Sequence, residues 1–194
     1  MPSILSLLDT PEPAHVTMKP RPGTRSLDDL NREMDKILSD PALDRRYCAL
    51  SRGAILLWHD HFEAAHELAQ NEENADGSLL HAIIHRREPD LSNARYWFRR
   101  VGNTHPSFGC ITGKVKIALM GMGHELLAKQ LMPKDQWSPL AFVDLVEDAL
   151  RREDAAYDQL LRQMQAAEFY CFLATLPSRV ASILPKRAFG PPSV

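Results

Sequence analysis

Apolar residues recur over 27–176 at the spacing of amphipathic helices. Ser26 precedes two acidic residues, as is typical of a helix N-cap, and predicts a helix over 27–38. Asp76, Asp90 and Ser138 are expected to cap later helices in the same way. Further helices are expected near 42–50 and over 52–71, 76–88, 90–102, 111–131 and 139–176. Because alternating β-branched runs and Asn-Gly turns are both missing from the sequence, it predicts an all-α bundle.

Two of the expected helices contain features that could interrupt them. The 111–131 segment includes Gly113, Gly121 and Gly123, each of which costs about 1 kcal/mol relative to alanine inside a helix. Either a neighbouring helix packs closely on these glycines, or the helix breaks near 121–123. The segment that starts at Pro139 has a similar candidate break near Glu153.

The two ends of the chain differ in composition from its middle. Residues 1–26 are rich in proline, which disfavours both helix and central strand. We expect a Pro-rich extended arm over 1–26, a single all-α domain over 27–176 and an extended tail over 177–194. The arm either docks on the domain through Leu5, Leu7 and Leu8 or stays disordered.

The overall composition restricts the partners. The chain has 194 residues, is 44% hydrophobic and has a formal net charge of −2, so no global positive field favours nucleic acid or an anionic membrane. Its apolar runs are too short to span a bilayer. Cys48, Cys110 and Cys171 are widely spaced, which predicts free thiols and a cytoplasmic location. The sequence does not indicate an oligomeric state.

Seven of the eight histidines lie between His59 and His124. On a helix over 52–71, His59, Glu63 and His66 would share one narrow stripe beside the apolar face. His81 and His85 would share a face of the next helix, which should lie antiparallel to the first. Histidine with carboxylate is a common ligand set for zinc, iron or manganese. The sequence therefore predicts a divalent transition metal bound by His59, Glu63, His66, His81 and His85.

Three functions fit this pattern. A metal-bound water would be acidic enough to act as a nucleophile, which predicts a hydrolase of a small anionic molecule. Glu63 would then be a metal ligand or general base, and Arg86 would hold the anion. Alternatively, the protein is non-enzymatic and its histidines form a buried hydrogen-bond network. The third hypothesis is an iron-dependent redox or oxygen-binding bundle.

Arginines and aromatic residues are interspersed over 86–100. Arginine binds carboxylates and phosphates through paired hydrogen bonds, so the segment could hold an anion beside the metal. It could instead contact nucleic acid, although the negative net charge disfavours this. The third interpretation is a set of internal ion pairs in which the aromatic side chains belong to the core.

The histidine-rich region resembles a family of bacterial and fungal proteins over the segment HELAQNEENADGSLLHAIIHRREPDLSNARYWFRRVGNTHP. That resemblance implies no particular activity. It implies that one constellation contains His59, His66, His81, His85, Arg86, Glu88 and Asn93. The adjacent His59 and Asp60 also resemble the paired residues of HD phosphohydrolases. The HxxxE and HxxxH spacings are similar to those of hemerythrin-like bundles, which would imply a di-iron site.

Overall fold

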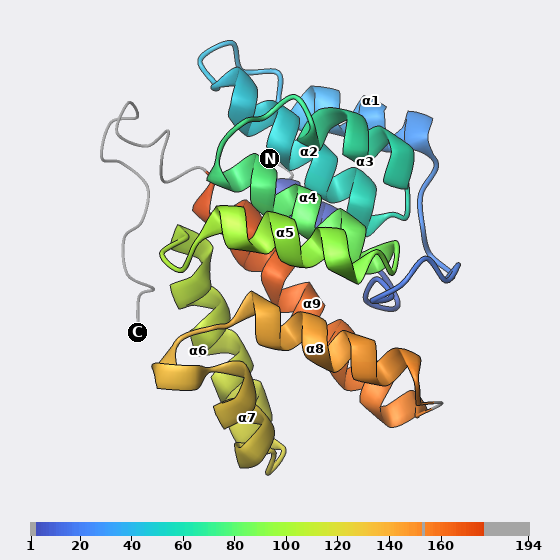
Figure 1. Ribbon diagram of the computed structural model, residues 1–194. Coiled ribbons are helices and arrows are strands. Elements are labelled where there is room, and N and C mark those ends of the chain that lie inside the picture. Colours follow the sequence, from blue (N-terminus) through green and yellow to red (C-terminus); the bar gives the residue numbers. More distant parts are fainter. Residues whose placement is uncertain (1–2, 153, 177–194) are drawn as a thin grey trace, which may run out of the picture.

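The computed structural model describes residues 3–152 and 154–176 (Figure 1). This part of the chain contains nine α-helices, two short 3-10 helices and no strand, which confirms the all-α class. The α-helices are α1 (Leu27–Ile37), α2 (Arg45–Trp58), α3 (Phe62–Ala69), α4 (Ala75–Arg87), α5 (Leu91–Val101), α6 (Pro106–Gly121), α7 (Glu125–Leu131), α8 (Pro139–Leu150) and α9 (Ala155–Thr175). The 3-10 helices are η1 (Ile4–Leu8) and η2 (Pro133–Asp135).

Helix α4 lies at the centre of the first half of the fold. It packs against α2, α3 and α5, and twelve of its thirteen residues are buried. A helix that is buried on every side must place its polar side chains in the interior. The histidines and arginines of α4 therefore need partners inside the protein.

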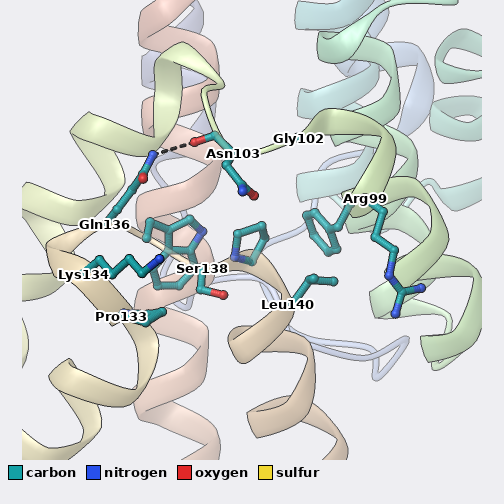
Figure 2. Close-up of a pocket in the computed structure, with 11 residues that line it drawn as sticks. Arg99, Gly102, Asn103, Pro133, Lys134, Gln136, Ser138 and Leu140 are labelled. Atoms are coloured by element: carbon teal, nitrogen blue, oxygen red, sulfur yellow. Dashed lines mark hydrogen bonds between the residues drawn. The ribbon is translucent and has the colours of Figure 1, made fainter.

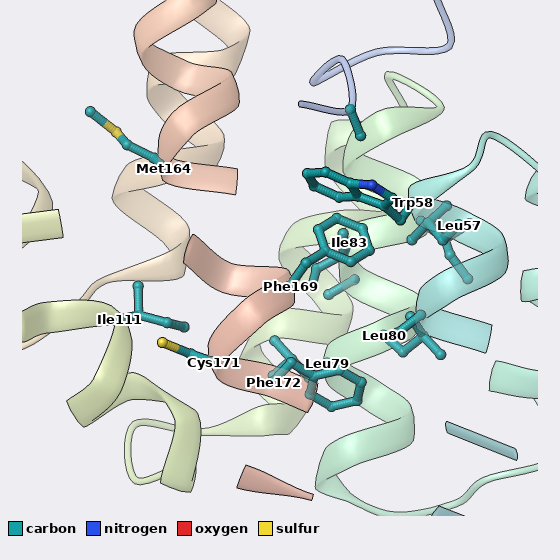
Figure 3. Close-up of a cluster of buried hydrophobic side chains, with 14 of the residues drawn as sticks. Leu57, Trp58, Leu79, Leu80, Ile83, Ile111, Met164, Phe169, Cys171 and Phe172 are labelled. Atoms are coloured by element: carbon teal, nitrogen blue, oxygen red, sulfur yellow. The ribbon is translucent and has the colours of Figure 1, made fainter. Parts of the chain in front are cut away.

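The second half of the fold is built on α9. Helix α6 packs along α9, and α8 packs against both α5 and α9. The loop before α8 is joined to the residue that follows Gly102, because Gln136 Nε2 donates to Asn103 O over 2.5 Å (Figure 2). Phe169 and Phe172 of α9 face Leu79 and the other apolar residues of the first half (Figure 3). One hydrophobic core therefore joins the two halves.

The N-terminal arm is docked on the helices over residues 3–26. Ile4, Leu7, Ala14 and Val16 are buried, and Ser3 caps η1. Leu7 is buried and Leu5 and Leu8 pack partly buried against the core, so the arm docks through the three predicted leucines. The short 3-10 helix that contains them was not expected. The predicted tail over 177–194 lies outside the described residues.

The predicted helix over 52–71 is wrong, because the chain breaks at residues 59–61. Asp60 has a φ of 69°, a left-handed conformation, although residues 59–61 include no glycine or proline that would predict a break there. Two buried arginines, Arg21 and Arg87, contact the Asp60 carboxylate from other segments. Tertiary contacts therefore accompany a break that local sequence does not indicate.

Several other boundaries are confirmed or corrected. Asp90, Ser26 and Ser138 cap their helices as expected. The helix over 111–131 begins earlier, at Pro106, and breaks after Gly121. A Cβ added at Gly113 or Gly121 would meet no neighbour, so close packing does not explain these glycines.

The start of α4 also differs from the prediction. Asn74, rather than Asp76, caps the helix by accepting a hydrogen bond from Gly77 N–H over 2.8 Å. A Cβ at Gly77 would lie 2.1 Å from Glu72 O, so only glycine fits this close approach. The predicted break near Glu153 is matched by the end of α8 and the start of α9.

The prediction of three free thiols is wrong for two of the cysteines. Cys110 of α6 and Cys171 of α9 form a disulfide, and only Cys48 is free. The two partners are 61 residues apart in sequence, so spacing alone could not reveal the pair. No helix in the described part of the chain has the length and apolar character needed to cross a bilayer.

Candidate metal centre

Three histidines from two adjacent helices form a compact group. His66 comes from α3, and His81 and His85 come from successive turns of α4. One ring nitrogen of each lies within 4.8 Å of the corresponding nitrogens of the other two. The Nε2 atoms of His66 and His81 are 2.6 Å apart. Each ring therefore has a nitrogen close to a common centre.

Helix α5 supports this group through Trp97. The indole ring stacks on His81 with the centroids 4.2 Å apart and the planes 8° from parallel. His81 and His85 are also parallel, with centroids 5.2 Å apart, while His66 meets both edge-on. The guanidinium of Arg100 lies 5.2 Å from the Trp97 centroid. The orientation of His81 is thus fixed by aromatic packing as well as by its own helix.

Burial keeps the imidazoles on α4 neutral near neutral pH. The pKa of His81 is lowered to about 4, first by burial and then by the nearby His66 and His85. The pKa of His85 is also lowered, mainly by burial, although Glu88 opposes the change. A metal ligand must offer an unprotonated nitrogen. Both side chains meet this requirement without losing a proton at neutral pH.

Further polar groups contact His85. Its Nδ1 lies 3.1 Å from Glu88 Oε2, and its Nε2 lies 3.3 Å from Asn93 Nδ2. A carboxylate at Nδ1 favours the tautomer with an unprotonated Nε2, a common arrangement around metal-bound histidine. In the structure this Nε2 faces the Asn93 amide donor, so a metal would have to displace Asn93 from it. His85, Glu88 and Asn93 therefore lie together, whereas His59 and Arg86 of the same expected constellation make their contacts elsewhere.

The structure does not bring the other two predicted ligands to this group. His59 ends α2 and faces the arm: its Nε2–H donates to Leu7 O over 2.9 Å, and its Nδ1 accepts from Arg25 N–H over 3.2 Å. Glu63 is exposed in the first turn of α3 and is not part of the three-histidine group. The predicted stripe fails because His59 and Glu63 lie on either side of the helix break.

The expectation that Arg86 holds an external anion is not supported by its contacts. Its guanidinium is fully buried and pairs with Glu168 of α9 through hydrogen bonds of 3.0 and 2.5 Å. It also lies 4.4 Å from the centroid of Phe142. Burial raises the pKa of Glu168, and the Arg86 charge opposes that increase. Arg86 therefore joins α4 to α9 as an internal ion pair.

Sequence reasoning left the role of Arg87 open. This side chain is also fully buried and donates to His15 O over 2.8 Å and to Asp60 Oδ1 over 2.6 Å. Arg21 from the arm approaches the other oxygen of Asp60 at 3.5 Å. Two cations thus share one carboxylate beneath the arm, and the arm completes this buried network.

His105 belongs to a second buried chain of hydrogen bonds. Its Nε2–H donates to Asp76 Oδ1 over 2.9 Å, and its Nδ1 lies 2.7 Å from Ser107 Oγ. Ser107 is fully buried, and the His105 ring also caps the N-terminus of α6. His105 is therefore a helix cap, and the buried Ser107 is not accessible as a nucleophile.

The free energy of unfolding should depend on pH through His59, which the arm covers. Burial lowers the pKa of this side chain, with a further decrease from the Arg21 charge. A histidine with a lower pKa in the folded state stabilises the fold fully above about pH 6.5, and this contribution is lost as the pH falls below that value. We expect His59→Gln to flatten the decrease in unfolding free energy between about pH 7 and pH 5.

Urea denaturation at a series of pH values measures this effect. His124→Gln is the control, because His124 is exposed before α7. An unchanged pH dependence in the His59 variant would contradict the assignment.

Comparison of the chain with family models, curated proteins and solved structures gives no match, so the site is interpreted from its own geometry. The resemblance of the histidine-rich segment to bacterial and fungal proteins stays a prediction.

Proposed function

We propose that this protein binds a divalent transition metal through His66, His81 and His85. The observation that carries the proposal is the convergence of three ring nitrogens within 4.8 Å, two of them from buried and neutral imidazoles. Three histidines with one open position are a known zinc ligand set, and imidazole also suits iron. Zinc is the first candidate because the three proposed ligands are all histidines and include no carboxylate.

Binding would require a small rearrangement of the rings. Two imidazole nitrogens on one tetrahedral zinc are about 3.3 Å apart, given bonds of about 2.0–2.1 Å. The 2.6 Å between the His66 and His81 nitrogens is shorter. His66 is only half-buried on α3, so its side chain can withdraw more easily than His81, which is stacked on Trp97.

The same short distance supports a second candidate function. At 2.6 Å, one of the two imidazoles can donate its N–H to the other without any metal. In this case, the three histidines would form a structural hydrogen-bond network in a non-enzymatic protein. The two candidates differ in metal content, which can be measured directly.

Metal loading of the full chain tests the proposal. Protein purified without a histidine tag and incubated with zinc should retain about one equivalent after dialysis, as measured by elemental analysis. Cobalt-loaded protein should show the visible absorption of a tetrahedral site. The visible absorption spectrum of an iron-loaded sample tests the hypothesis of an iron-dependent redox or oxygen-binding protein. Protein that retains no stoichiometric zinc, cobalt, manganese or iron would overturn metal binding and favour the network.

Hydrolysis is a further part of the proposal. A metal held by three histidines would supply an acidified water as the nucleophile. Glu63 lies one helical turn before His66 on α3 and stays the proposed general base, although it is not among the metal-binding histidines. Release of nitrophenol from simple esters by zinc-loaded protein is the assay for hydrolysis. Arg86 would have to leave Glu168 to hold an anionic substrate, so we no longer assign the anion to Arg86.

A cytoplasmic location also stays a proposal. Cys110 and Cys171 no longer support it, because they form a disulfide and are not free thiols.

A further inference from the structure

A pocket of about 430 Å³ lies between the end of α5 and the loop that leads into α8 (Figure 2). Phe98, Trp137 and Leu140 contribute apolar surface to its lining. Its polar lining comes from Lys134, Asn103, Gln136 and Arg99, together with Ser138 at the N-cap of α8. A pocket of this size can hold a small metabolite.

The charge of the lining favours an anion. None of the described residues that line the pocket is acidic, whereas Lys134 and Arg99 are cationic. In Figure 2, the Lys134 side chain extends toward the other residues that line the pocket, while the Arg99 guanidinium points away from Lys134. The first turn of α8, a helix of twelve residues, adds the positive end of its dipole. Lys134 and this helix end would therefore face the anionic group.

A buried donor provides independent support for a ligand. Trp137 is 3% exposed, and its Nε1–H has no acceptor among the described residues. An unsatisfied buried donor destabilises the fold, so such groups call for a specific explanation. Trp137 lines the pocket while its Nε1 is covered, so an acceptor atom in the pocket would satisfy this donor once the indole ring turns toward it.

The loop that carries these groups is held from both sides. Trp137 N–H donates to Thr112 Oγ1 over 2.9 Å, and Asp135 pairs with Lys116 at 2.9 Å. The carboxylate of Asp135, the neighbour of Lys134 in sequence, is thus paired with Lys116. Lys134 itself forms no ion pair with the described residues. The loop therefore presents one unpaired cation to the pocket from a fixed backbone.

We propose that this pocket binds a small organic oxyanion, a carboxylate or phosphate monoester attached to an apolar ring. The oxyanion would lie near Lys134 and the start of α8, with an oxygen accepting from Trp137 Nε1–H. The ring would pack on Phe98 and Leu140. This inference does not depend on the metal, because none of the three histidines lines the pocket.

Phenyl phosphate and benzoate are suitable probes, with phenol as the neutral analogue and inorganic phosphate as the anion without a ring. The full chain contains three tryptophans, so its nitrogen–proton NMR spectrum should show three indole signals. The signal that disappears in Trp137→Phe identifies Nε1–H of this residue. Millimolar phenyl phosphate is expected to shift that signal more than the other two.

Variants separate a specific site from general charge attraction. Lys134 lines the pocket but is itself solvent-exposed, so Lys134→Gln should weaken phenyl phosphate binding by about fivefold, the upper end for an exposed charge pair. Lys129→Gln removes the same charge from an exposed position on α7 and should leave the affinity within about twofold, as expected for a screened surface charge. Both variants should keep the parent melting temperature.

Three outcomes would overturn the proposal. The first is no shift of the Trp137 signal with either anionic probe. The second is phenol binding as tightly as phenyl phosphate, which would make the pocket a purely apolar cavity. The third is an equal loss of affinity in the Lys134 and Lys129 variants, which would indicate non-specific attraction.

Discussion

Replacing Glu168 with alanine is expected to destabilise the protein by about 3–5 kcal/mol, because it leaves the Arg86 charge buried without a partner. Arginine cannot release its proton at ordinary pH, so the charge cannot be neutralised. The reverse change, Arg86→Met, should cost less. Burial already raises the pKa of Glu168, and this carboxyl can take up a proton when the cation is absent.

Urea denaturation monitored by circular dichroism measures both variants. Arg32→Ala is the control, because Arg32 and its partner Asp29 form an exposed ion pair on α1. Breaking such a pair should cost less than about 1 kcal/mol. A Glu168 variant no less stable than this control would show that the Arg86–Glu168 pair is not a principal link between α4 and α9.

The double change His81→Ala with His85→Ala should weaken zinc binding by more than about 100-fold, since loss of contacts outside the ligand shell alone costs about 10–100-fold. Zinc affinity measured against a competing chelator gives the ratio. His124→Ala removes an exposed histidine and serves as the matched control.

Stability separates the two candidate functions in the same samples. If the double variant retains its metal content while its melting temperature falls sharply, the histidines are a structural network. His66→Ala supplies a second check, because His66 is less buried than the histidines of α4 and its loss should disturb the core less. Unchanged zinc affinity in this variant would contradict its assignment as a ligand.

Local sequence signals predicted the all-α class and many helix ends, but neither the continuous helix α2 over Arg45–Trp58 nor the break that follows it. The caps at Ser26, Asp90 and Ser138 depend only on nearby residues, and all three are confirmed. The break at Asp60 could not be predicted in this way, because its partners Arg21 and Arg87 are distant in sequence. One missed break moved His59 out of the predicted stripe.

The candidate site was predicted only as far as local sequence signals reach. His81 and His85 lie one turn apart on one helix, so helical spacing was sufficient to place them together. Their approach to His66 depends on how α3 packs against α4, which the short polar loop between the helices made plausible. The partner of Arg86 lies on α9, 82 residues away, and no local pattern distinguishes an internal ion pair from an anion site.

The position of the arm has a practical consequence for expression. Its carbonyl groups accept hydrogen bonds from Arg87 and from Gln165, the latter through Ala14 O and His15 O. A shortened polypeptide starting at Leu27 would remove these acceptors and uncover donors that the helices cannot satisfy. Affinity tags and fusion partners should therefore be added without deleting the N-terminal arm, even though its high proline content suggests that it is dispensable.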